Sequence, residues 1–399
     1  MSKRFVERRG YLAQLDAFRD NTDFVKVITG VRRCGKSTLM TQFIRRLEQG
    51  GVPSEKIFRF NLEDPEYFEI RQAEDLKNEV FAKIPRSDRC YVFLDEIQRA
   101  EGWERVVNAL MSGTDADIYI TGSNAHLLSS ELTTYLTGRY VSIKMLPLSF
   151  GEWQELYGSD LDDAGAIRAY MAYGGFPAVD PALGNESIRT ILRDLYASIV
   201  KWDVATRGQI RNMGELDRLM VYMMHNIGNP LSLNNIVEGL QAGRELVERY
   251  LNLMEEAFIL YRADRFDIAS KALSPAHKYY AVDLGLREMA VGFTQKDPGR
   301  VLENIIYLEL LRRSYTVQIG KYDVREVDFV ATPLTGGREY YQVCLTMLDE
   351  KTAERELSVL RAIKDNFPKT ILTLDPVVRY LTEDGIAVMY VVDWLLGRN

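Results

Sequence analysis

The residues with the clearest chemistry lie between Gly30 and Ser37, where the sequence GVRRCGKS fits the pattern G-x-x-x-x-G-K-[ST]. Glycines at the fixed positions let the backbone approach phosphate oxygens, and the helix that follows adds the positive end of its dipole. We expect Lys36 to reach the β- and γ-phosphates of ATP and the Ser37 hydroxyl to bind Mg²⁺. A coincidental glycine-rich turn is the alternative, but an apolar run before the loop and a helical pattern after it favour a nucleotide site. The predicted nucleotide-binding residues are Gly30, Val31, Arg32, Arg33, Cys34, Gly35, Lys36, Ser37 and Thr38.

Two acids end the apolar segment YVFLDEIQ. A buried parallel strand would deliver Asp95 beside the glycine-rich loop, where it can hold Mg²⁺ through water, and Glu96 can polarise the attacking water as a general base. The alternative is a strand that ends in a solvated acidic turn. Two independent motifs in the order that a nucleotide site requires favour the catalytic interpretation.

Two further candidates follow along the chain. The segment ITGSNA contains Ser123 and Asn124. Asn124, or Ser123 as the weaker choice, could position water or sense the γ-phosphate. Either residue could instead cap the next helix. Arg139 follows Gly138 at the end of that helix and could reach a neighbouring subunit's nucleotide as an arginine finger, or it could be an ordinary surface residue. With these, the predicted catalytic residues are Lys36, Glu96, Asn124 and Arg139.

The elements that position these residues follow from apolar patterning. Five short apolar runs in the first 150 residues predict strands of a parallel α/β sheet, at 24–29, 56–62, 90–94, 117–122 and 140–145. The pattern from there to about residue 285 is almost wholly helical, and helices with strands follow to the end. We predict an ATP-binding core over 1–150, a helical lid or linker over 151–204, a winged-helix-like segment over 205–285 and an α/β domain over 286–399.

Several of these motifs together resemble a prokaryotic family of AAA+ ATPases whose members carry a C-terminal domain of uncharacterised function. The resemblance rests on GVRRCGKST, VFLDEIQ, GSNAHLLS and TGRYVSIKMLPLSFGEW, and it continues in YGGFP, KYYAVDLGLR and VLENIIYLELLRR, so it covers nearly the whole chain. It implies an AAA+ sheet with strand order 5-1-4-3-2, a small helical lid and assembly of identical subunits into a ring, with a hexamer expected. It also favours the arginine-finger role for Arg139.

The last domain is similar to the restriction-endonuclease-like fold, in which clustered carboxylates hold Mg²⁺ and a lysine helps to position water. Glu303 and Asp328 fit the first two metal-binding places. Gln342 and Cys344 stand where that chemistry needs an acid and a lysine, and neither can replace them. We therefore expect a nuclease-like fold without cutting activity, and the alternative for the two acids is hydrogen bonding inside the domain.

A winged-helix segment could bind DNA, but its charges give weak support. The candidate recognition helix over 241–257 carries two arginines and four glutamates, which would repel phosphates unless the acids face inward. The wing, with Arg262, Arg265 and Lys271, is the better candidate contact. Packing of the winged helix against protein is the alternative.

Composition sets the remaining limits. The chain has 399 residues, of which 46% are hydrophobic and 27% charged, and its net charge of −7 argues against a protein that coats nucleic acid. Cys34, Cys90 and Cys344 have no metal-ligand spacing and suit a reducing compartment, although oxidation of Cys34 would crowd the phosphates. No segment has the length of a membrane span or the apolar core of a signal peptide, so we expect a cytoplasmic protein without a membrane partner.

These observations leave three classes of function. The first is an ATP-hydrolysing AAA+ ring that uses ATP and Mg²⁺. The second is an ATP-dependent assembly switch with low turnover, against which the intact Glu96 argues. The third is a DNA-directed ATPase or nuclease, against which Gln342 and Cys344 argue.

Overall fold

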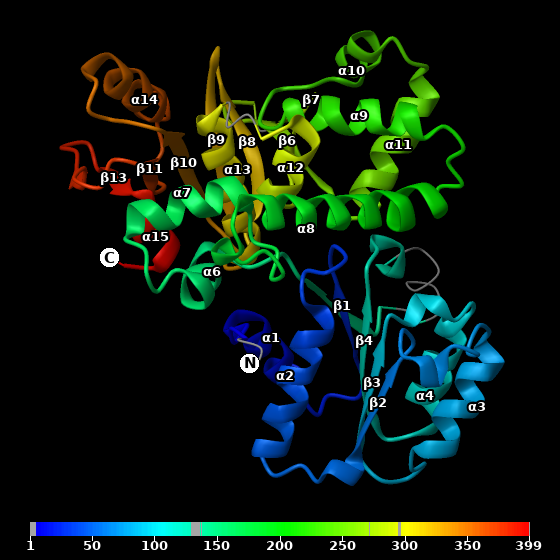
Figure 1. Cartoon of the computed structure of the whole chain (residues 1–399). Coiled ribbons are helices and arrows are strands. Elements are labelled where there is room, and N and C mark those ends of the chain that lie inside the picture. The colour runs from blue at the N-terminus through cyan, green and yellow to red at the C-terminus, as the bar shows by residue number, and fades with distance from the viewer. Residues whose placement is uncertain (1–4, 129–135, 137, 271, 294–296, 399) are drawn as a thin grey trace. The chain divides into compact units, whose positions relative to one another are not determined.

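The computed structural model describes residues 5–128, 136, 138–270, 272–293 and 297–398 (Figure 1). The chain forms two compact units. The first comprises Met1–Pro147 with Glu256–Phe258, and the second comprises Leu148–Glu255 and Ile259–Asn399.

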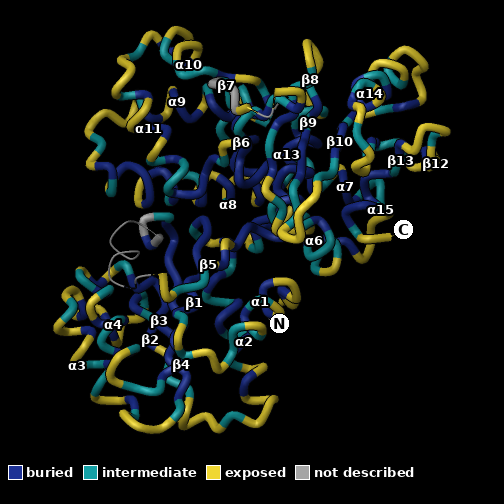
Figure 2. Tube along the Cα trace, turned by 180° about the vertical axis from the view of Figure 1, so that it is seen from behind, coloured by how far each residue is buried: buried dark blue, intermediate teal, exposed yellow. Residues whose placement is uncertain are grey.

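The first unit is built on a five-stranded parallel sheet with the strand order β2-β3-β4-β1-β5. Every residue of the three central strands is buried, as their continuous apolar sequences predicted (Figure 2). Read from β5, the order is the 5-1-4-3-2 order that the AAA+ resemblance implied, so that prediction is confirmed. The strands are β1 (Val25–Thr29), β2 (Ile57–Asn61), β3 (Cys90–Asp95), β4 (Ala116–Gly122) and β5 (Tyr140–Lys144).

Helices cover both faces of this sheet (Figure 1). On one face Val92 and Leu94 of β3 belong to the core that contains residues of α3 and α4. Side chains of a strand alternate between faces, so Phe93 points the other way and stacks on Tyr119, and Phe43 of α2 packs against both rings. The helices are α1 (Arg9–Ala17), α2 (Lys36–Gln49), α3 (Ala73–Lys83) and α4 (Trp103–Gly113), with short 3₁₀ helices at Ser54–Lys56, Pro65–Tyr67, Ile97–Arg99 and Ala125–Leu128.

A fully buried ion pair joins two of the central strands. Lys26 of β1 pairs with Asp117 of β4, and both side chains are inaccessible to solvent. Asp117 also accepts hydrogen bonds from the Tyr119 hydroxyl at 2.8 Å and from the backbone N–H of Asp20 at 2.9 Å. Burial lowers the pKa of Lys26 and raises that of Asp117, and each partner opposes the shift of the other.

The second unit begins with helices, as the sequence predicted. Ser232 caps α10 by accepting a hydrogen bond from the N–H of Asn235 at 3.2 Å. The helices are α6 (Phe150–Tyr157), α7 (Asp163–Tyr173), α8 (Asn185–Ser198), which continues as a π-helix over Ile199–Thr206, α9 (Met213–His225), α10 (Leu233–Leu240), α11 (Arg244–Glu256) and α12 (Leu284–Val291), with a 3₁₀ helix at Pro181–Leu183.

An eight-stranded mixed sheet with the order β12-β13-β11-β10-β9-β8-β6-β7 forms the rest of this unit. Its strands are β6 (Leu260–Asp267), β7 (Ala272–Ala281), β8 (Thr316–Tyr322), β9 (Arg325–Thr332), β10 (Glu339–Cys344), β11 (Lys369–Thr373), β12 (Tyr380–Leu381) and β13 (Ile386–Tyr390). Three more helices, α13 (Pro298–Arg312), α14 (Glu350–Ala362) and α15 (Val391–Leu396), complete the unit.

Two sequence-based boundaries differ from the structure. The hairpin β6–β7, which we assigned to a separate winged-helix segment, pairs through β6 with β8, so residue 285 does not separate two independent sheets. The apolar segment GIAVMYVV, whose sequence alone would extend one strand to its end, leaves the strand β13 at Tyr390 and continues as α15. Val391, Val392, Trp394 and Leu395 supply a buried helical face that apolar residues in a short run do not distinguish from a strand. Within the described ranges, no helix combines the length and apolar character needed to cross a bilayer.

Candidate functional site

The glycine-rich loop connects β1 to α2 at the carboxyl edge of the sheet. Gly30 has a φ of 154°, and a Cβ atom there would lie 2.1 Å from the carbonyl oxygen of Met145. Gly35 has a φ of 110° and directly precedes α2, a helix of 14 residues. Both glycines are therefore required by local geometry, and the loop presents the N-terminus of a long helix to an anion.

Lys36, Ser37 and Thr38 open α2, as the motif predicted. The Lys36 ammonium is buried and donates hydrogen bonds to the carbonyl oxygens of Gly30 at 3.0 Å and of Val31 at 3.4 Å. It also lies 3.7 Å from Oε1 of Glu96. The structure thus brings the predicted phosphate-binding lysine beside the predicted general base.

The carboxylate of Asp95 lies within hydrogen-bonding distance of Ser37. Oδ1 of Asp95 accepts hydrogen bonds from the hydroxyls of Ser37 at 3.1 Å and Thr121 at 2.5 Å, and the side chain of Asp95 is fully buried. Hydroxyl and carboxylate oxygens side by side are the ligands that Mg²⁺ prefers, so the two residues predicted to hold the metal fit it. Arg59 lies on the other side, with its guanidinium 3.4 Å from Oδ2 of Asp95.

Glu96 directly follows β3 in a left-handed conformation with φ of 52°. Its backbone N–H donates to Oγ1 of Thr121 at 2.9 Å, so this hydroxyl links both acids to β4. Left-handed backbone at a non-glycine residue is strained and is often found at active sites. The carboxylate of Glu96 is also held by Gln98, whose Nε2 donates a hydrogen bond to Oε2 of Glu96.

Sequence reasoning missed three of these residues. Thr121, Arg59 and Gln98 contact the two predicted catalytic acids, and although all three lie in segments that we had singled out, none of them was assigned a role. The available signal was the position of Thr121 near the end of a buried strand and that of Gln98 two residues after Glu96. Ser123 and Asn124, which we chose instead, are buried just after the same strand, immediately before the 3₁₀ helix Ala125–Leu128. The longer helix expected to follow lies outside the described residues.

Arg139 lies at the amino ends of the strands, whereas the glycine-rich loop of its own chain lies at their carboxyl ends. Strands β1 and β5 are parallel with Val25 opposite Tyr140, so Arg139 precedes β5 while Gly30 follows β1. Six residue steps at about 3.3 Å each separate the two positions by roughly 20 Å. The side chain is exposed, and it donates to the carbonyl oxygen of Leu136 and to Oδ1 of Asn108, each at 3.3 Å.

Buried side chains support the glycine-rich loop from behind. The guanidinium of Arg8 donates to the carbonyl oxygens of Cys34 at 3.2 Å and Leu146 at 2.8 Å, which ties the loop to the segment after β5. Cys34 is inaccessible, and burial raises the pKa of its thiol although Lys36 and Arg8 oppose the shift. An inaccessible neutral thiol reacts poorly, so the oxidation of Cys34 that we expected is not supported.

Arginines from the loop and from the Asp95 segment share one acid. Oε1 of Glu63 lies 2.9 Å from the guanidinium of Arg32 and 3.0 Å from that of Arg99. Partial burial would raise the pKa of Glu63, but Arg32, Arg99 and Arg33 together lower it. The variable residue Arg32 of the loop is therefore held by an ion pair with Glu63, and Arg33 adopts a left-handed conformation with φ of 67°.

The predicted nuclease-like residues gather around a lysine that sequence reasoning did not identify. The buried ammonium of Lys278, on β7, lies 2.9 Å from Glu303 and 2.8 Å from Glu326. Burial would lower the pKa of Lys278, but Glu303, Asp328 and Glu326 raise it. The Tyr280 hydroxyl donates to the same oxygen of Glu303 at 2.6 Å. The alternative of internal hydrogen bonding by Glu303 therefore describes this structure.

The other members of this cluster are also paired. Oδ2 of Asp328 accepts a hydrogen bond from the N–H of Val343 at 2.8 Å, and burial together with Glu303 raises the pKa of Asp328 well above its ordinary value. Gln342 donates to Glu356 at 2.8 Å. Burial raises the pKa of Cys344 to about 12, so its thiol stays neutral. Among the described residues, no group of three or more His, Cys, Asp or Glu side chains could hold a metal ion.

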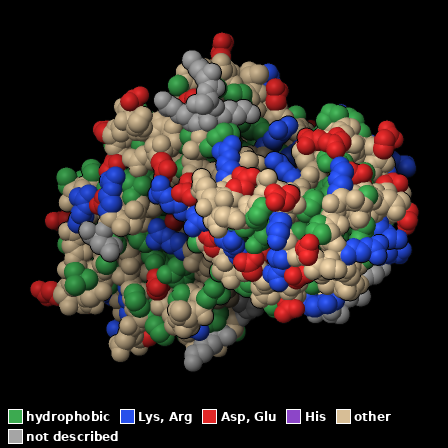
Figure 3. Space-filling view, turned by 90° about the horizontal axis from the view of Figure 1, so that it is seen from below, with side chains coloured by type: hydrophobic (Ala, Val, Ile, Leu, Met, Phe, Trp, Pro, Cys, Tyr) green, Lys and Arg blue, Asp and Glu red, His purple; other side chains and the backbone are tan. Residues whose placement is uncertain are grey.

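The described arginines of the candidate recognition helix and wing already have protein partners. Arg244 lies 3.2 Å from Glu248, and the Arg249 guanidinium donates to the carbonyl oxygen of Gly208. In the wing, Arg262 lies 3.4 Å from Asp264 and Arg265 lies 3.2 Å from Glu326, while Lys271 lies outside the described residues. On the face drawn in Figure 3, Lys and Arg side chains are interspersed with Asp and Glu side chains.

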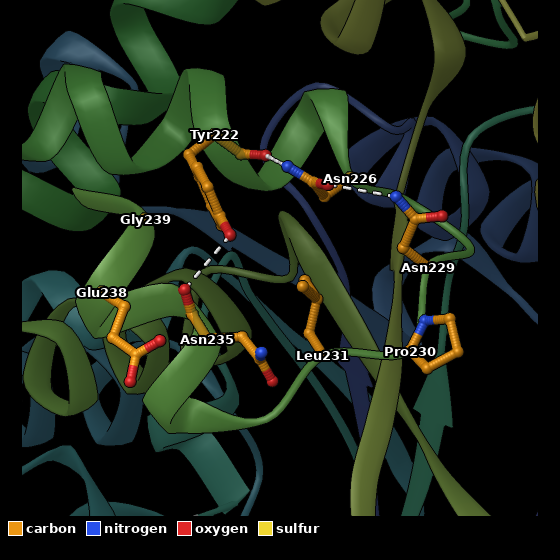
Figure 4. A pocket seen from close by; sticks show the side chains of 8 residues that line it. All are labelled: Tyr222, Asn226, Asn229, Pro230, Leu231, Asn235, Glu238 and Gly239. Carbon is orange, nitrogen blue, oxygen red and sulfur yellow. Dashed lines mark hydrogen bonds between the residues drawn. The ribbon is translucent and has the colours of Figure 1, made fainter.

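A shallow pocket of the second unit carries no comparable chemistry (Figure 4). Its amides bond to one another or to the backbone: Asn226 donates to the carbonyl oxygen of Tyr222 at 2.8 Å, and Asn229 donates to Oδ1 of Asn226 at 3.0 Å. Its lining contains one acid and no Lys, Arg, His or Cys: Tyr222, Asn226, Asn229, Pro230, Leu231, Asn235, Glu238 and Gly239.

Comparisons with known protein families agree with the first unit's geometry. A family model described as an AAA domain matches residues 22–154, and one described as a domain of unknown function, DUF8612, matches residues 165–297. Residues 22–154 therefore form an AAA domain with a P-loop nucleotide site. An uncharacterised protein of Haemophilus influenzae is 41% identical over 412 residues, which cover 99% of this chain and 100% of the relative. The uncharacterised protein MJ1544 of Methanocaldococcus jannaschii is 31% identical over 364 residues, which cover 86% of this chain and 79% of the relative.

Two solved structures are more distantly similar. The ORC1 protein of Aeropyrum pernix, in complex with DNA, is 12% identical with a TM-score of 0.33, covering 74% of this chain and 94% of that one. A DNA polymerase III gamma subunit-related protein of Thermotoga maritima is 15% identical with a TM-score of 0.31, and the match covers 62% of this chain and 99% of that one. TM-scores this low carry no argument about function.

Proposed function

This chain belongs to the same family as the Haemophilus influenzae protein and MJ1544, and we propose that it is an AAA+ ATPase that hydrolyses ATP with Mg²⁺. The observation that supports the proposal most directly is the meeting of four predicted residues at one edge of the sheet. Lys36 lies 3.7 Å from Glu96, and Ser37 lies 3.1 Å from Asp95. The glycine-rich loop and the N-terminus of α2 frame the same place.

The chemistry assigned to each residue follows from its position. Lys36 leaves the loop carbonyls to neutralise the β- and γ-phosphate oxygens, and the loop N–H groups and α2 bind the remaining charge. Mg²⁺, held by Ser37 and through water by Asp95, would neutralise charge on the phosphates. Glu96 accepts a proton from the attacking water as the general base. Asn124 remains a candidate for sensing the γ-phosphate, from its place just beyond the end of β4.

Assembly into a ring of identical subunits, with a hexamer as the expected size, completes the proposal. Arg139 is exposed and roughly 20 Å along the strand direction from its own glycine-rich loop, beyond the reach of one side chain. If Arg139 acts on a nucleotide, that nucleotide therefore belongs to another copy of the chain. A finger in this role typically contributes roughly a thousand- to hundred-thousand-fold in rate.

We propose a nuclease-like but inactive α/β domain at the C-terminus. The Lys278 ammonium pairs with Glu303 and Glu326, and Gln342 is bound to Glu356. These contacts favour a closed ion-pair network over a metal site. The ion pairs of the winged-helix-like segment give no independent support for DNA binding, so a DNA-directed activity is the weaker candidate.

The decisive experiment is phosphate release by the wild type, Lys36→Ala and Glu96→Gln. We expect steady ATP hydrolysis by the wild type and a loss of at least roughly a hundredfold in both variants, since each removes a group that acts in the transition state. Glu96→Gln should still bind ATP, whereas Lys36→Ala should bind it weakly. Equal rates in all three proteins would contradict the proposal. Tight ATP binding with turnover well below one per minute would favour the assembly switch.

A further inference from the structure

Gln98 holds the predicted general base from the side opposite Lys36. It lies in the 3₁₀ helix Ile97–Arg99, which directly follows Glu96, and its Nε2 donates a hydrogen bond to Oε2 of Glu96. A carboxylate can only accept hydrogen bonds when ionised, so the nitrogen of the amide must face it. The other oxygen of Glu96 lies 3.7 Å from Lys36. Gln98 and Lys36 therefore hold one oxygen each of the predicted general base.

The carbonyl oxygen of the Gln98 amide has no hydrogen-bond partner among the described residues. Oε1 is buried, and no described residue donates a hydrogen bond to it. A buried acceptor left without a hydrogen bond costs about 1–3 kcal/mol, so such an atom calls for a water or a ligand that supplies the missing donor. The missing donor at Oε1 is independent of the contact that Nε2 makes with Glu96.

The unpartnered oxygen lies at the edge of the sheet where the phosphates are expected. A Cβ atom on Gly122 would lie 2.7 Å from Oε1 of Gln98, so the amide passes directly over that glycine. Gly122 is the last residue of β4, which is the strand between β3 and β1. Oε1 therefore sits between the strand that delivers Glu96 and the strand that leads to the glycine-rich loop.

We propose that Gln98 positions the attacking water together with Glu96, an inference that rests on the proposed ATPase function. Oε1 of Gln98 accepts a hydrogen bond from the water, and Nε2 fixes the carboxylate that takes the water's other proton. The water oxygen bonds to the γ-phosphorus while the bond to the β–γ bridging oxygen breaks, and that electron pair leaves with ADP. Gln98 remains neutral throughout and supplies orientation only.

The test is Gln98→Met, which keeps a side chain of similar length against Gly122 and Leu127 but makes no hydrogen bond. The matched control is Gln154→Met, which removes a comparable amide–carboxylate contact of 3.1 Å to Asp163 in the second unit. We would measure kcat and KM for ATP, together with the affinities for ADP and for ADP–aluminium fluoride. The latter complex mimics the phosphoryl group under attack.

We expect kcat of Gln98→Met to fall on the order of a hundredfold, because a misplaced water loses its near-attack geometry. Affinity for ADP should stay within about twofold, while affinity for ADP–aluminium fluoride should fall by a factor similar to kcat, since only the transition state uses the contact. Gln154→Met should match the wild type in all four measurements.

A second variant, Gln98→Glu, keeps the shape but places a carboxyl group against Glu96. The two carboxylates can share a hydrogen bond only when one proton is present, and like charge raises the pKa of the pair. Its kcat relative to wild type should therefore rise as the pH falls from 8 to 6.

Three results would overturn the inference. An unchanged kcat in Gln98→Met would mean that the amide does not act on the water. A raised kcat would mean that it restrains Glu96 instead, and an equal loss of ADP affinity would mean that the substitution damages the site generally. A wild type without hydrolysis would refute the proposed function itself, so the two failures are distinguishable.

Discussion

Replacing Lys278 with Met removes the cation at the centre of the C-terminal carboxylate cluster. The side chain is 5% exposed, and its ammonium lies 2.9 Å from Glu303 and 2.8 Å from Glu326. Removing one partner of a buried ion pair costs about 3–5 kcal/mol, because the remaining charge is left without compensation. For a domain of 150–250 residues, 1 kcal/mol lowers the melting temperature by about 2–4 °C, so we expect a loss of roughly 6–20 °C.

The effect should depend on pH in a defined direction. Burial and Glu303 raise the pKa of Asp328 in the folded protein, and Lys278 opposes that shift. A carboxyl group with a raised folded pKa binds its proton more tightly in the folded state, so stability falls as the pH rises through that pKa. Without Lys278 the pKa of Asp328 rises further. The stability deficit of the variant should therefore be smallest in acid and grow toward neutral pH.

The assay is thermal unfolding followed by tryptophan fluorescence at several pH values. Three of the four tryptophans, Trp153, Trp202 and Trp394, belong to the second unit, so the signal reports mainly on the unit that contains the cluster. The matched control is Lys321→Met, whose partner Asp267 lies 3.7 Å away on an exposed surface. Exposed ion pairs contribute at most about 1 kcal/mol. Equal losses in the two variants, or a deficit that does not change with pH, would refute the reasoning.

Two further substitutions test the first unit. Lys26→Met should destabilise it by about 3–5 kcal/mol in urea unfolding followed by circular dichroism, because Asp117 would keep a fully buried charge; a loss below about 1 kcal/mol would contradict this. Gly30→Ala should weaken ATP binding at least tenfold in an equilibrium titration, because its Cβ would lie 2.1 Å from the carbonyl oxygen of Met145. Gly51→Ala is the control, since it also has a positive φ but open space around it, and comparable ATP affinities for the two variants would count against the steric argument.

The local parts of the nucleotide site could be predicted because each depends on residues close together in the sequence. The glycine-rich loop needs its two glycines and its lysine within eight positions, and the pair Asp95–Glu96 ends one strand. The parallel sheet and its order were likewise accessible, the first from continuous apolar strands and the second from a family resemblance. Thr121 and Arg59 could not be assigned this way, since their contacts with Asp95 depend on which strands end side by side. The contact of Gln98 with Glu96 is local, but it depends on the 3₁₀ turn that directly follows Glu96.

The C-terminal domain shows the same division. The sequence identified Glu303 and Asp328 and the neutral residues Gln342 and Cys344, but it gave no sign that Lys278, on a hairpin assigned to another segment, compensates the acids.

The sequence by itself therefore determined the nucleotide site and the strands that carry it, because short-range steric and hydrogen-bonding requirements select glycine, lysine, serine and acid at fixed spacing. Only the tertiary structure decided which side chains surround the predicted catalytic acids and which cation compensates the C-terminal carboxylates. Apart from the local contact of Gln98 with Glu96, those contacts join residues on different strands or helices, 26 positions apart for Thr121 and Asp95 and 25 for Lys278 and Glu303, and they arise only when the sheets form.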